Sequence, residues 1–257
     1  ICTAFLRGRE ITWFELGLHC DVDREKADRI YKTVRQDLGG GSDRRPRGTT
    51  RINLYHSPGA GGSTIARRIL WQMHYEFPCV VLHRTVPPET ADRVQTIYHL
   101  TGLPLLVLVE GAEIPENLTE DLFSLLRARQ TPAVFLQVLR RFNSTEDRER
   151  SFHIDSSLSL VEATRFAHRL AEARPTRKAH IVGLASRASA DERSAFYLAL
   201  ETFEEEFEGL HKYVAARILL ATDQQKTILL FLSLAYHYGQ QPVSAQSFAG
   251  ILSLPRT

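Results

Sequence analysis

The chain has few cysteines and no long apolar run. Its three cysteines, Cys2, Cys20 and Cys79, are an odd number and show none of the close spacings of a zinc site. We therefore predict reduced thiols in a cytoplasmic protein. No apolar stretch reaches the length of a membrane span, and no signal peptide is recognisable. We expect no membrane partner.

The net charge is also small. The 32 basic and 30 acidic residues leave +2 at neutral pH, which gives no general reason to expect a nucleic acid or an anionic membrane as a partner. Local arginines at 44, 45 and 47, or at 140 and 141, could contact phosphates. A solvated loop or surface is the simpler interpretation, and we do not expect nucleic acid to be the main ligand.

Motifs for acyl transfer and for metal centres are missing. Ser57, Ser63 and Thr64 have no recognisable His/Asp partners, and there is no G-x-S-x-G sequence. The histidines at 153, 168 and 180 lack the Cys or carboxylate neighbours of a zinc site. Nucleophilic catalysis and resident transition metals are therefore not predicted.

The chain begins at Ile1, so we expect a piece of a longer protein. We divide it into an N-terminal junction and linker (1–49), an α/β core (50–155), a helical lid (156–222) and the start of a winged-helix-like unit (223–257). A charged helix is predicted from Asp23 to Leu38. The pattern after residue 156 favours helices at 158–173, 195–220, 224–238 and 244–252.

The core alternates short apolar strands with helices. The predicted strands are 51–55, 79–82, 105–109 and 133–139, and the predicted helices are 63–75, 88–101 and 117–129. Continuous apolar strands separated by helices indicate a parallel sheet that is covered on both faces. Ligands of such sheets bind at the carboxyl ends of the strands.

The most informative stretch is residues 52–66, where an apolar strand runs into a glycine-rich turn and then into a helix. This is the order of a phosphate-binding P-loop, in which backbone N–H groups and the helix N-terminus hold an anion. The sequence predicts nucleotide contacts from the following residues: Ser57, Gly59, Ala60, Gly61, Gly62, Ser63 and Thr64. Ser63 has the hydroxyl that would bind magnesium.

The P-loop lysine is missing. When the chain is aligned on G-x-x-x-x-G-K-[ST], the first glycine falls on His56, the second on Gly61 and the lysine on Gly62. The loop is therefore expected to hold a nucleotide, ATP or ADP with Mg²⁺, and to cleave it slowly or not at all. A turn between strand and helix that binds nothing is the alternative.

Two later strands end in residues that could serve the same site. Glu110 follows a buried apolar strand, as a Walker B carboxylate does, and could bind magnesium directly or through water. The next position, where a catalytic acid is common, is Gly111. Arg140 ends the strand at 133–139 and could contact a γ-phosphate. We assign the catalytic roles to Glu110 and Arg140.

The loop resembles that of STAND-type NTPases, which read G-x-G-G-x-G-K-T-T-L-A. That sequence lines up with residues 56–66 and differs at His56, Pro58 and Gly62. More narrowly, residues 52–56, Pro58-Gly59, Gly61-Gly62 and Leu70-Trp71 resemble the sterile-alpha-motif-domain-containing antiviral family and its bacterial relatives, which also lack the lysine. Residues 5–8, 12–14, 79–82 and 225–250 resemble it too.

This resemblance implies a regulatory, oligomerising NTPase module of an antiviral or anti-phage defence protein. An effector region would precede the module, and repeats would follow it. The family has an aspartate where Glu110 stands and commonly a second acid at Gly111. The expected partners are a nucleotide, other copies of the chain, or other domains of a longer chain. The alternative is a pseudo-NTPase that oligomerises without binding nucleotide.

Overall fold

A computed structural model describes residues 2–40, 46, 48–110, 114–140, 150–187, 189 and 192–239. The chain forms two compact units, Ile1–Phe203 and Glu204–Thr257. Several sequence predictions lie outside the described residues. They concern Arg44, Arg45, Arg47, Gly111, Arg141 and the helix at 244–252.

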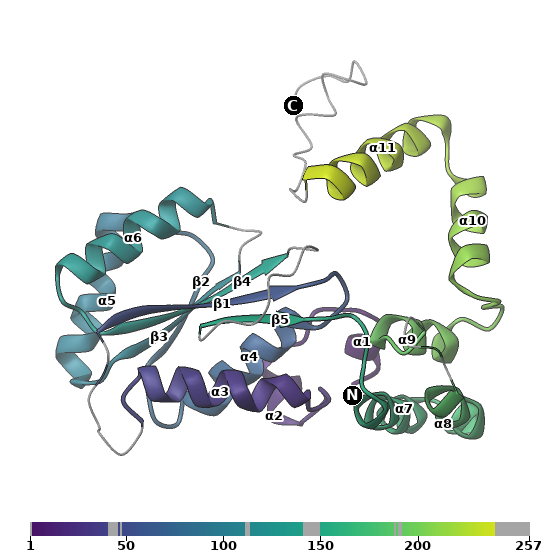
Figure 1. Ribbon diagram of the computed structural model, residues 1–257, viewed down its shortest axis with the longest axis horizontal. Helices are drawn as coiled ribbons and strands as arrows, with labels where there is room; N and C mark the ends of the chain where they lie inside the picture. Colours follow the sequence, from purple (N-terminus) through teal and green to yellow (C-terminus); the bar gives the residue numbers. More distant parts are fainter. Residues whose placement is uncertain are drawn as a thin grey trace. The chain divides into compact units, whose positions relative to one another are not determined.

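The first unit contains a five-stranded parallel sheet in the order β2-β3-β4-β1-β5 (Figure 1). Its strands are β1 (Thr49–His56), β2 (Cys79–Leu82), β3 (Leu105–Glu110), β4 (Ala133–Arg140) and β5 (Ser151–Ile154). The predicted α/β class with a parallel sheet is confirmed. Four strands lie where the apolar runs predict them, whereas β5 was not predicted.

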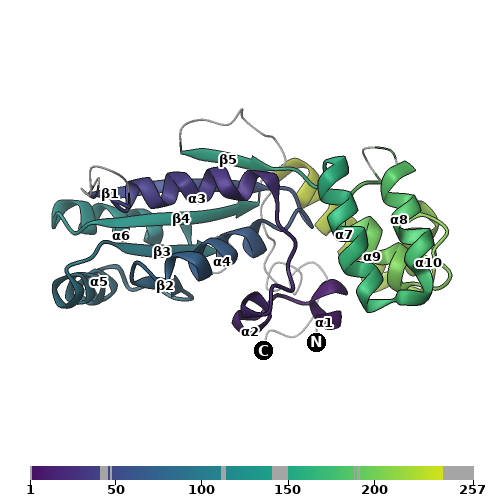
Figure 2. The ribbon, with the colours of Figure 1, turned by 90° about the horizontal axis from the view of Figure 1, so that it is seen from below.

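Helices cover both faces of this sheet (Figure 2). On one face, α3 (Glu25–Asp37) and α4 (Gly62–Met73) pack on alternate residues of β1, β3 and β4. On the other face, α5 (Pro87–Thr101) and α6 (Glu116–Ala128) pack on the intervening residues of β3 and β4. Residues 105–109 of β3 are thus fully buried, as expected for a strand covered on both sides.

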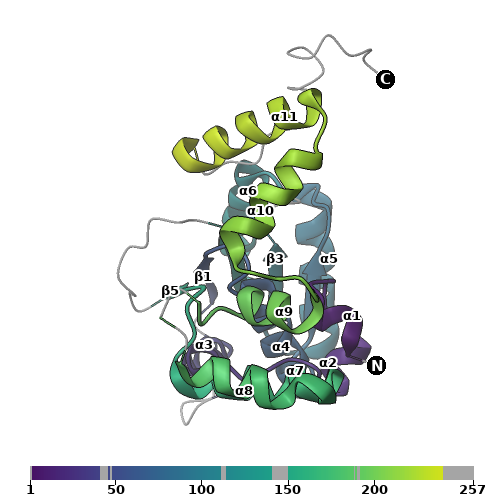
Figure 3. The same cartoon turned by 90° about the vertical axis from the view of Figure 1, so that its right-hand side faces the viewer.

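A third apolar cluster joins α7 (Leu160–Ala173), α8 (Lys178–Arg187) and α9 (Ala195–Phe203), with Leu6 of α1 (Thr3–Leu6) packed against them (Figure 3). A capping box begins α7, because the Ser159 side chain accepts from the Glu162 N–H and Glu162 accepts from the Ser159 N–H. A short 3₁₀ turn, η1 (Pro175–Arg177), separates α7 from α8. The sequence did not predict α8.

In the second unit, α10 (Leu210–Leu220) and α11 (Asp223–Leu234) are followed by a π-helical turn, η2 (Ala235–Gly239). The single helix predicted at 195–220 is wrong, because 204–209 separates α9 from α10. Gly209 has φ 102° and stands at the N-cap of α10, a backbone conformation that interrupts a helix. Among the described helices, none is both long and apolar enough to cross a membrane.

The N-terminal segment corrects the prediction of reduced thiols. Cys2, just before α1, and Cys20, just after α2 (Trp13–Gly17), form a disulfide with their Cα atoms 5.4 Å apart. The turn of chain between the two helices brings these cysteines together, which their spacing does not reveal. Cys79 is a free thiol, and burial raises its pKa to about 12. The disulfide removes the cysteine-based reason for a cytoplasmic location.

We expect the Cys2–Cys20 bond to be detectable and stabilising. Without reductant, the intact mass should be lower than the reduced mass by two hydrogen atoms, and a digest should contain the linked peptides. Closing a short loop of this kind contributes about 2–4 kcal/mol to the free energy of unfolding. Cys2→Ser/Cys20→Ser should lose that amount in a denaturant titration, whereas Cys79→Ser should keep the bond. Free thiols at all three positions would contradict this assignment.

Candidate phosphate-binding site

The loop between β1 and α4 has the backbone that its glycines predict. The Ser57 carbonyl accepts from the Ala60 N–H at 3.1 Å, and Gly59 has φ 71°. Proline at the second turn position and a positive-φ glycine at the third are typical of a type II turn, which accounts for Pro58. Gly61 also has a left-handed conformation, with φ 84°, and forms the N-cap of α4.

The start of α4 offers backbone donors. No side chain caps this helix, and the first N–H groups of any helix have no acceptor within it. The hydroxyl of the half-buried Ser63 has no hydrogen-bond partner among the described residues. All seven predicted nucleotide-binding residues lie in this loop or in the first turn of α4. A bare helix N-terminus approached through two left-handed glycines fits an anionic ligand.

Gly62 is in close contact with the side chain of His56. A Cβ atom placed on Gly62 would lie 2.5 Å from Cδ2 and 2.9 Å from Cβ of His56, and closer still to Cγ. Real Cβ atoms do not make such contacts, so residue 62 has to be glycine while His56 keeps this position. The two departures from the P-loop pattern are therefore complementary: a ring at the first-glycine position packs on the bare lysine position.

His56 lies at the carboxyl end of β1 and is only 6% exposed. Burial lowers its pKa, and the positive charge of Arg140 lowers it further, as does His153. The Ser57 carbonyl and the charge of Glu110 act in the opposite direction. The imidazole is therefore neutral in the absence of a ligand at neutral pH.

Glu110, the predicted metal ligand, ends β3 and is engaged by a cation from α4. Arg67 Nη2 donates to Glu110 Oε2 at 2.5 Å, and the two side chains are 13% and 12% exposed. Arg67 also pairs with Glu10 and donates to the Ile11 carbonyl at 3.2 Å. A metal ion at Glu110 would share this carboxylate with Arg67.

Arg140, the predicted γ-phosphate contact, ends β4. Its Cα lies opposite that of His56 in the parallel ladder. The residue is exposed, and within the described parts of the chain no carboxylate pairs with it. The ends of β1, β3 and β4 thus bring His56, Glu110 and Arg140 to the same edge of the sheet, as the parallel topology predicts. The roles assigned to Glu110 and Arg140 remain predictions.

Arg24 links the loop to the helices that follow the sheet, and sequence reasoning missed it. Its Nη1 donates to the Ala60 carbonyl at 2.7 Å, and its Nε donates to Glu162 Oε1 at 2.8 Å. Its Nη2 reaches the Asp155 carbonyl at 3.3 Å. The Arg24 and Glu162 side chains are 9% and 8% exposed. The guanidinium thus joins the P-loop, the segment after β5 and α7.

Glu162 is held as an anion by several donors. Burial alone would raise its pKa, but the Arg24 charge and the N–H groups of Glu25 and Ser159 bring the pKa below its usual value. The capping box at Ser159 is the only sequence signal for this carboxylate, and it predicts a helix start, not a contact with the P-loop. Phe196 of α9 also lies beside the loop, 3.7 Å from a Cβ placed on Gly59.

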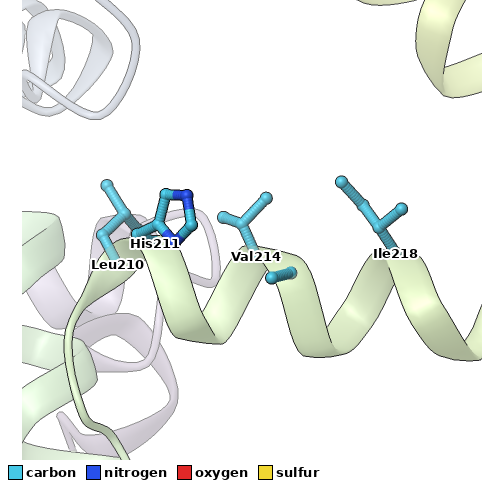
Figure 4. A pocket seen from close by; sticks show the side chains of 5 residues that line it. Leu210, His211, Val214 and Ile218 are labelled. Atoms are coloured by element: carbon cyan, nitrogen blue, oxygen red, sulfur yellow. The ribbon is translucent and has the colours of Figure 1, made fainter.

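A hollow on the second unit carries none of the predicted site residues. Figure 4 shows its lining along α10: Leu210, His211, Val214, Ala215 and Ile218. Because all five belong to one helix, this is a mainly apolar surface and not an enclosed cavity. His211 is its one titratable side chain.

Comparison with known proteins finds relatives of this chain by sequence. No family model matches the chain. It is 26% identical over 180 residues to human sterile alpha motif domain-containing protein 9, a match covering 62% of this chain and 11% of that protein. It is 28% identical over 189 residues to human sterile alpha motif domain-containing protein 9-like, a match covering 65% of this chain and 12% of that protein. The predicted resemblance to the sterile-alpha-motif-domain-containing family is confirmed.

These relatives are much longer, since the matched part is about a ninth of their length. Among solved structures, a STAND protein with a tetratricopeptide repeat sensor from Pyrococcus horikoshii aligns over 91% of this chain and 37% of its own, with a TM-score of 0.44 and 9% identity. PCH-2 of C. elegans aligns over 59% of this chain and 47% of its own, with a TM-score of 0.42 and 11% identity. At these scores we draw no conclusion from either likeness.

The contact between His56 and Gly62 can be tested by stability alone. Gly62→Ala should lower the free energy of unfolding by about 1–3 kcal/mol, because the new methyl group displaces the His56 ring. In His56→Ala/Gly62→Ala that clash is absent, so the double variant should be more stable than the sum of the two single effects. Denaturant titrations of the four proteins measure this coupling. Simple additivity would show that the two residues do not touch.

Proposed function

We propose that the chain is a nucleotide-binding switch module of a larger antiviral or anti-phage defence protein, with weak or no hydrolysis. The observation that supports it best is the loop from β1 to α4. Its left-handed glycines, Gly59 and Gly61, lead to an uncapped helix N-terminus at the carboxyl edge of a parallel sheet. That arrangement favours a phosphate group.

The residues of the loop and of the strand ends suit ATP or ADP with Mg²⁺. The phosphates would lie against the N–H groups between Gly59 and Thr64, and the Ser63 hydroxyl with the Glu110 carboxylate would hold the metal. Oxygen ligands of this kind are those that Mg²⁺ prefers. When bound, Mg²⁺ would neutralise phosphate charge. Arg140, exposed at the end of the neighbouring strand β4, would contact the terminal phosphate.

Arg24 supports the switch part of this proposal. Any ligand that moves the backbone at Ala60 also moves the acceptor of Arg24, whose other partner is Glu162 on α7. Occupancy of the loop would thereby alter how α7–α9 are held against the core. Differential stabilisation of two arrangements by a ligand is what a switch requires. Self-association, or contact with other domains of the longer chain, would transmit the change. A cytoplasmic site of action is part of this proposal.

The second candidate is a pseudo-NTPase that oligomerises without nucleotide. Two observations favour it: the His56 ring lies against the position from which a lysine would project, and Arg67 already neutralises Glu110. The two candidates differ in whether the Ser63 hydroxyl matters. Under the second, its removal changes neither affinity nor defence activity of the longer protein.

Nucleotide binding decides between them. In calorimetry with magnesium, ATP or ADP should bind the chain, and Ser63→Ala should weaken binding about tenfold or more. This is the loss expected when a contact contributing about 1.5–3 kcal/mol is removed. Ser186→Ala, the same change at an exposed serine of α8, should leave affinity unchanged. Absence of binding at millimolar concentrations of either nucleotide would overturn the first candidate.

Hydrolysis should be slow or absent. P-loop enzymes stabilise the transferred phosphoryl group with a lysine and magnesium, and they position the attacking water. Gly62 removes the lysine, and Gly111 removes the commonest water-positioning acid. Each missing partner costs about 10²–10³-fold in rate. Phosphate release by the isolated chain should stay far below about one turnover per second. Faster release that is abolished by Ser63→Ala would contradict this expectation.

A further inference from the structure

His56 occupies the space where a P-loop lysine would start. The lysine of the ordinary motif projects from the Cβ of residue 62, and in this chain that point lies within the contact distance of the His56 ring. The ring edge facing Gly62 carries Cδ2, the carbon bonded to Nε2. Among the described residues, the side chain nearest to the lysine position is therefore that of residue 56, six residues earlier in the chain.

The hydrogen bonds of the ring fix which nitrogen is available. His56 Nδ1 lies 3.0 Å from the Ser57 carbonyl. Since a carbonyl only accepts, Nδ1 carries a proton in this contact. In the neutral ring Nε2 is then unprotonated, and it has no hydrogen-bond partner within the described residues. A second proton at Nε2 would convert the ring into a cation with a donor to offer.

The charges around His56 explain why the second proton is absent without a ligand. Burial disfavours the imidazolium most, and the exposed Arg140 on β4 and His153 on β5 disfavour it further. The hydrogen bond to the Ser57 carbonyl and the charge of Glu110 on β3 favour it, but Arg67 on α4 neutralises the Glu110 carboxylate. A phosphate brought to the loop adds negative charge beside the ring and reverses this balance.

We propose that His56 replaces the P-loop lysine, so that its imidazolium contacts the phosphates of the bound nucleotide and binding takes up a proton. This inference rests on the proposed function, because it concerns the same loop. In it, Nε2 gains a proton from solvent and donates it in a hydrogen bond to a phosphate oxygen. A lysine would bring its charge permanently, whereas this histidine brings it only with the ligand.

The direction of the pH dependence follows. The pKa of His56 is low in the free protein and higher when an anion is bound. Between those two values the bound state holds one more proton, so affinity rises as pH falls, by at most about tenfold per pH unit. Above both pKa values the His56 ring is neutral in the free and in the bound protein, so its protonation no longer changes the affinity with pH.

Proton uptake can be measured on the unaltered chain. Calorimetric titration with Mg·ADP at about pH 7, in two buffers of different ionisation enthalpy, gives the number of protons taken up on binding. We expect a value between zero and about one, and tighter binding at about pH 6 than at about pH 8. His56→Gln, which keeps a polar side chain but cannot become charged, should abolish the uptake. His168→Gln, a change at an exposed histidine of α7, should preserve it.

Replacing both residues by those of the ordinary motif provides a second test. His56→Gly/Gly62→Lys restores both ordinary motif residues and removes the clash. This variant should bind Mg·ADP at least as tightly as the unaltered chain at about pH 8, with the pH dependence lost, because lysine stays protonated throughout that range. Gly62→Lys alone should be destabilised, since His56 still fills the space. Thermal melts identify any variant that does not fold.

The outcomes separate the two proposals. Binding without proton uptake, or uptake that persists in His56→Gln, overturns the role of His56 and leaves the nucleotide-binding function standing. Failure to bind ATP or ADP at any pH overturns the nucleotide-binding function itself, and the inference with it. Uptake that is lost in His56→Gln and retained in His168→Gln supports the inference.

Discussion

Burial of β3 and β4 on both faces is the constraint from which the rest of the architecture follows. Val107, Leu108, Phe135 and Leu136 are completely inaccessible, and each buried side chain of this size contributes about 1.5–3 kcal/mol. A parallel sheet with helices on both sides buries such strands. Because all five strands then run in one direction, their carboxyl ends meet at one edge, where His56, Glu110 and Arg140 lie.

Buried ion pairs tie the elements around that edge together. Arg24–Glu162 and Arg67–Glu110 each join residues far apart in the sequence, and all four side chains are at most 13% exposed. Removing one partner of such a pair leaves an uncompensated buried charge, which is strongly destabilising. These pairs specify the arrangement of α3, α4 and α7 more than they add stability. Each also has one end at the P-loop or at a strand end.

The sequence predicts the parts of this fold that local pattern determines. Four apolar strands and the helices between them are close to their predicted bounds, because continuous apolar runs mark the buried strands and helical spacing of apolar residues marks the helices. The strand β5 was missed because it has four residues, two of them polar. The break between α9 and α10 was missed because the glutamates at 204–206 are good helix formers. The helix is interrupted by the backbone of Gly209, which has a positive φ.

Tertiary contacts are what sequence pattern could not supply. The site residues of the loop follow from the motif, but nothing in the sequence connects Arg24 with Ala60 or Arg67 with Glu110, which are 36 and 43 residues apart. The Cys2–Cys20 bond was missed for the same reason. His56 was recognised as a departure from the motif, yet its relation to Gly62 appears only in three dimensions.

The packing of His56 on Gly62 also limits how this loop can change by single substitutions. A lineage that carries both residues cannot regain the lysine in one step, because any side chain at position 62 meets the ring first. The histidine has to be replaced beforehand, and that intermediate would have neither a lysine nor an imidazole at this position of the loop. A loop of this kind is therefore held in its present form by the order in which mutations would have to occur.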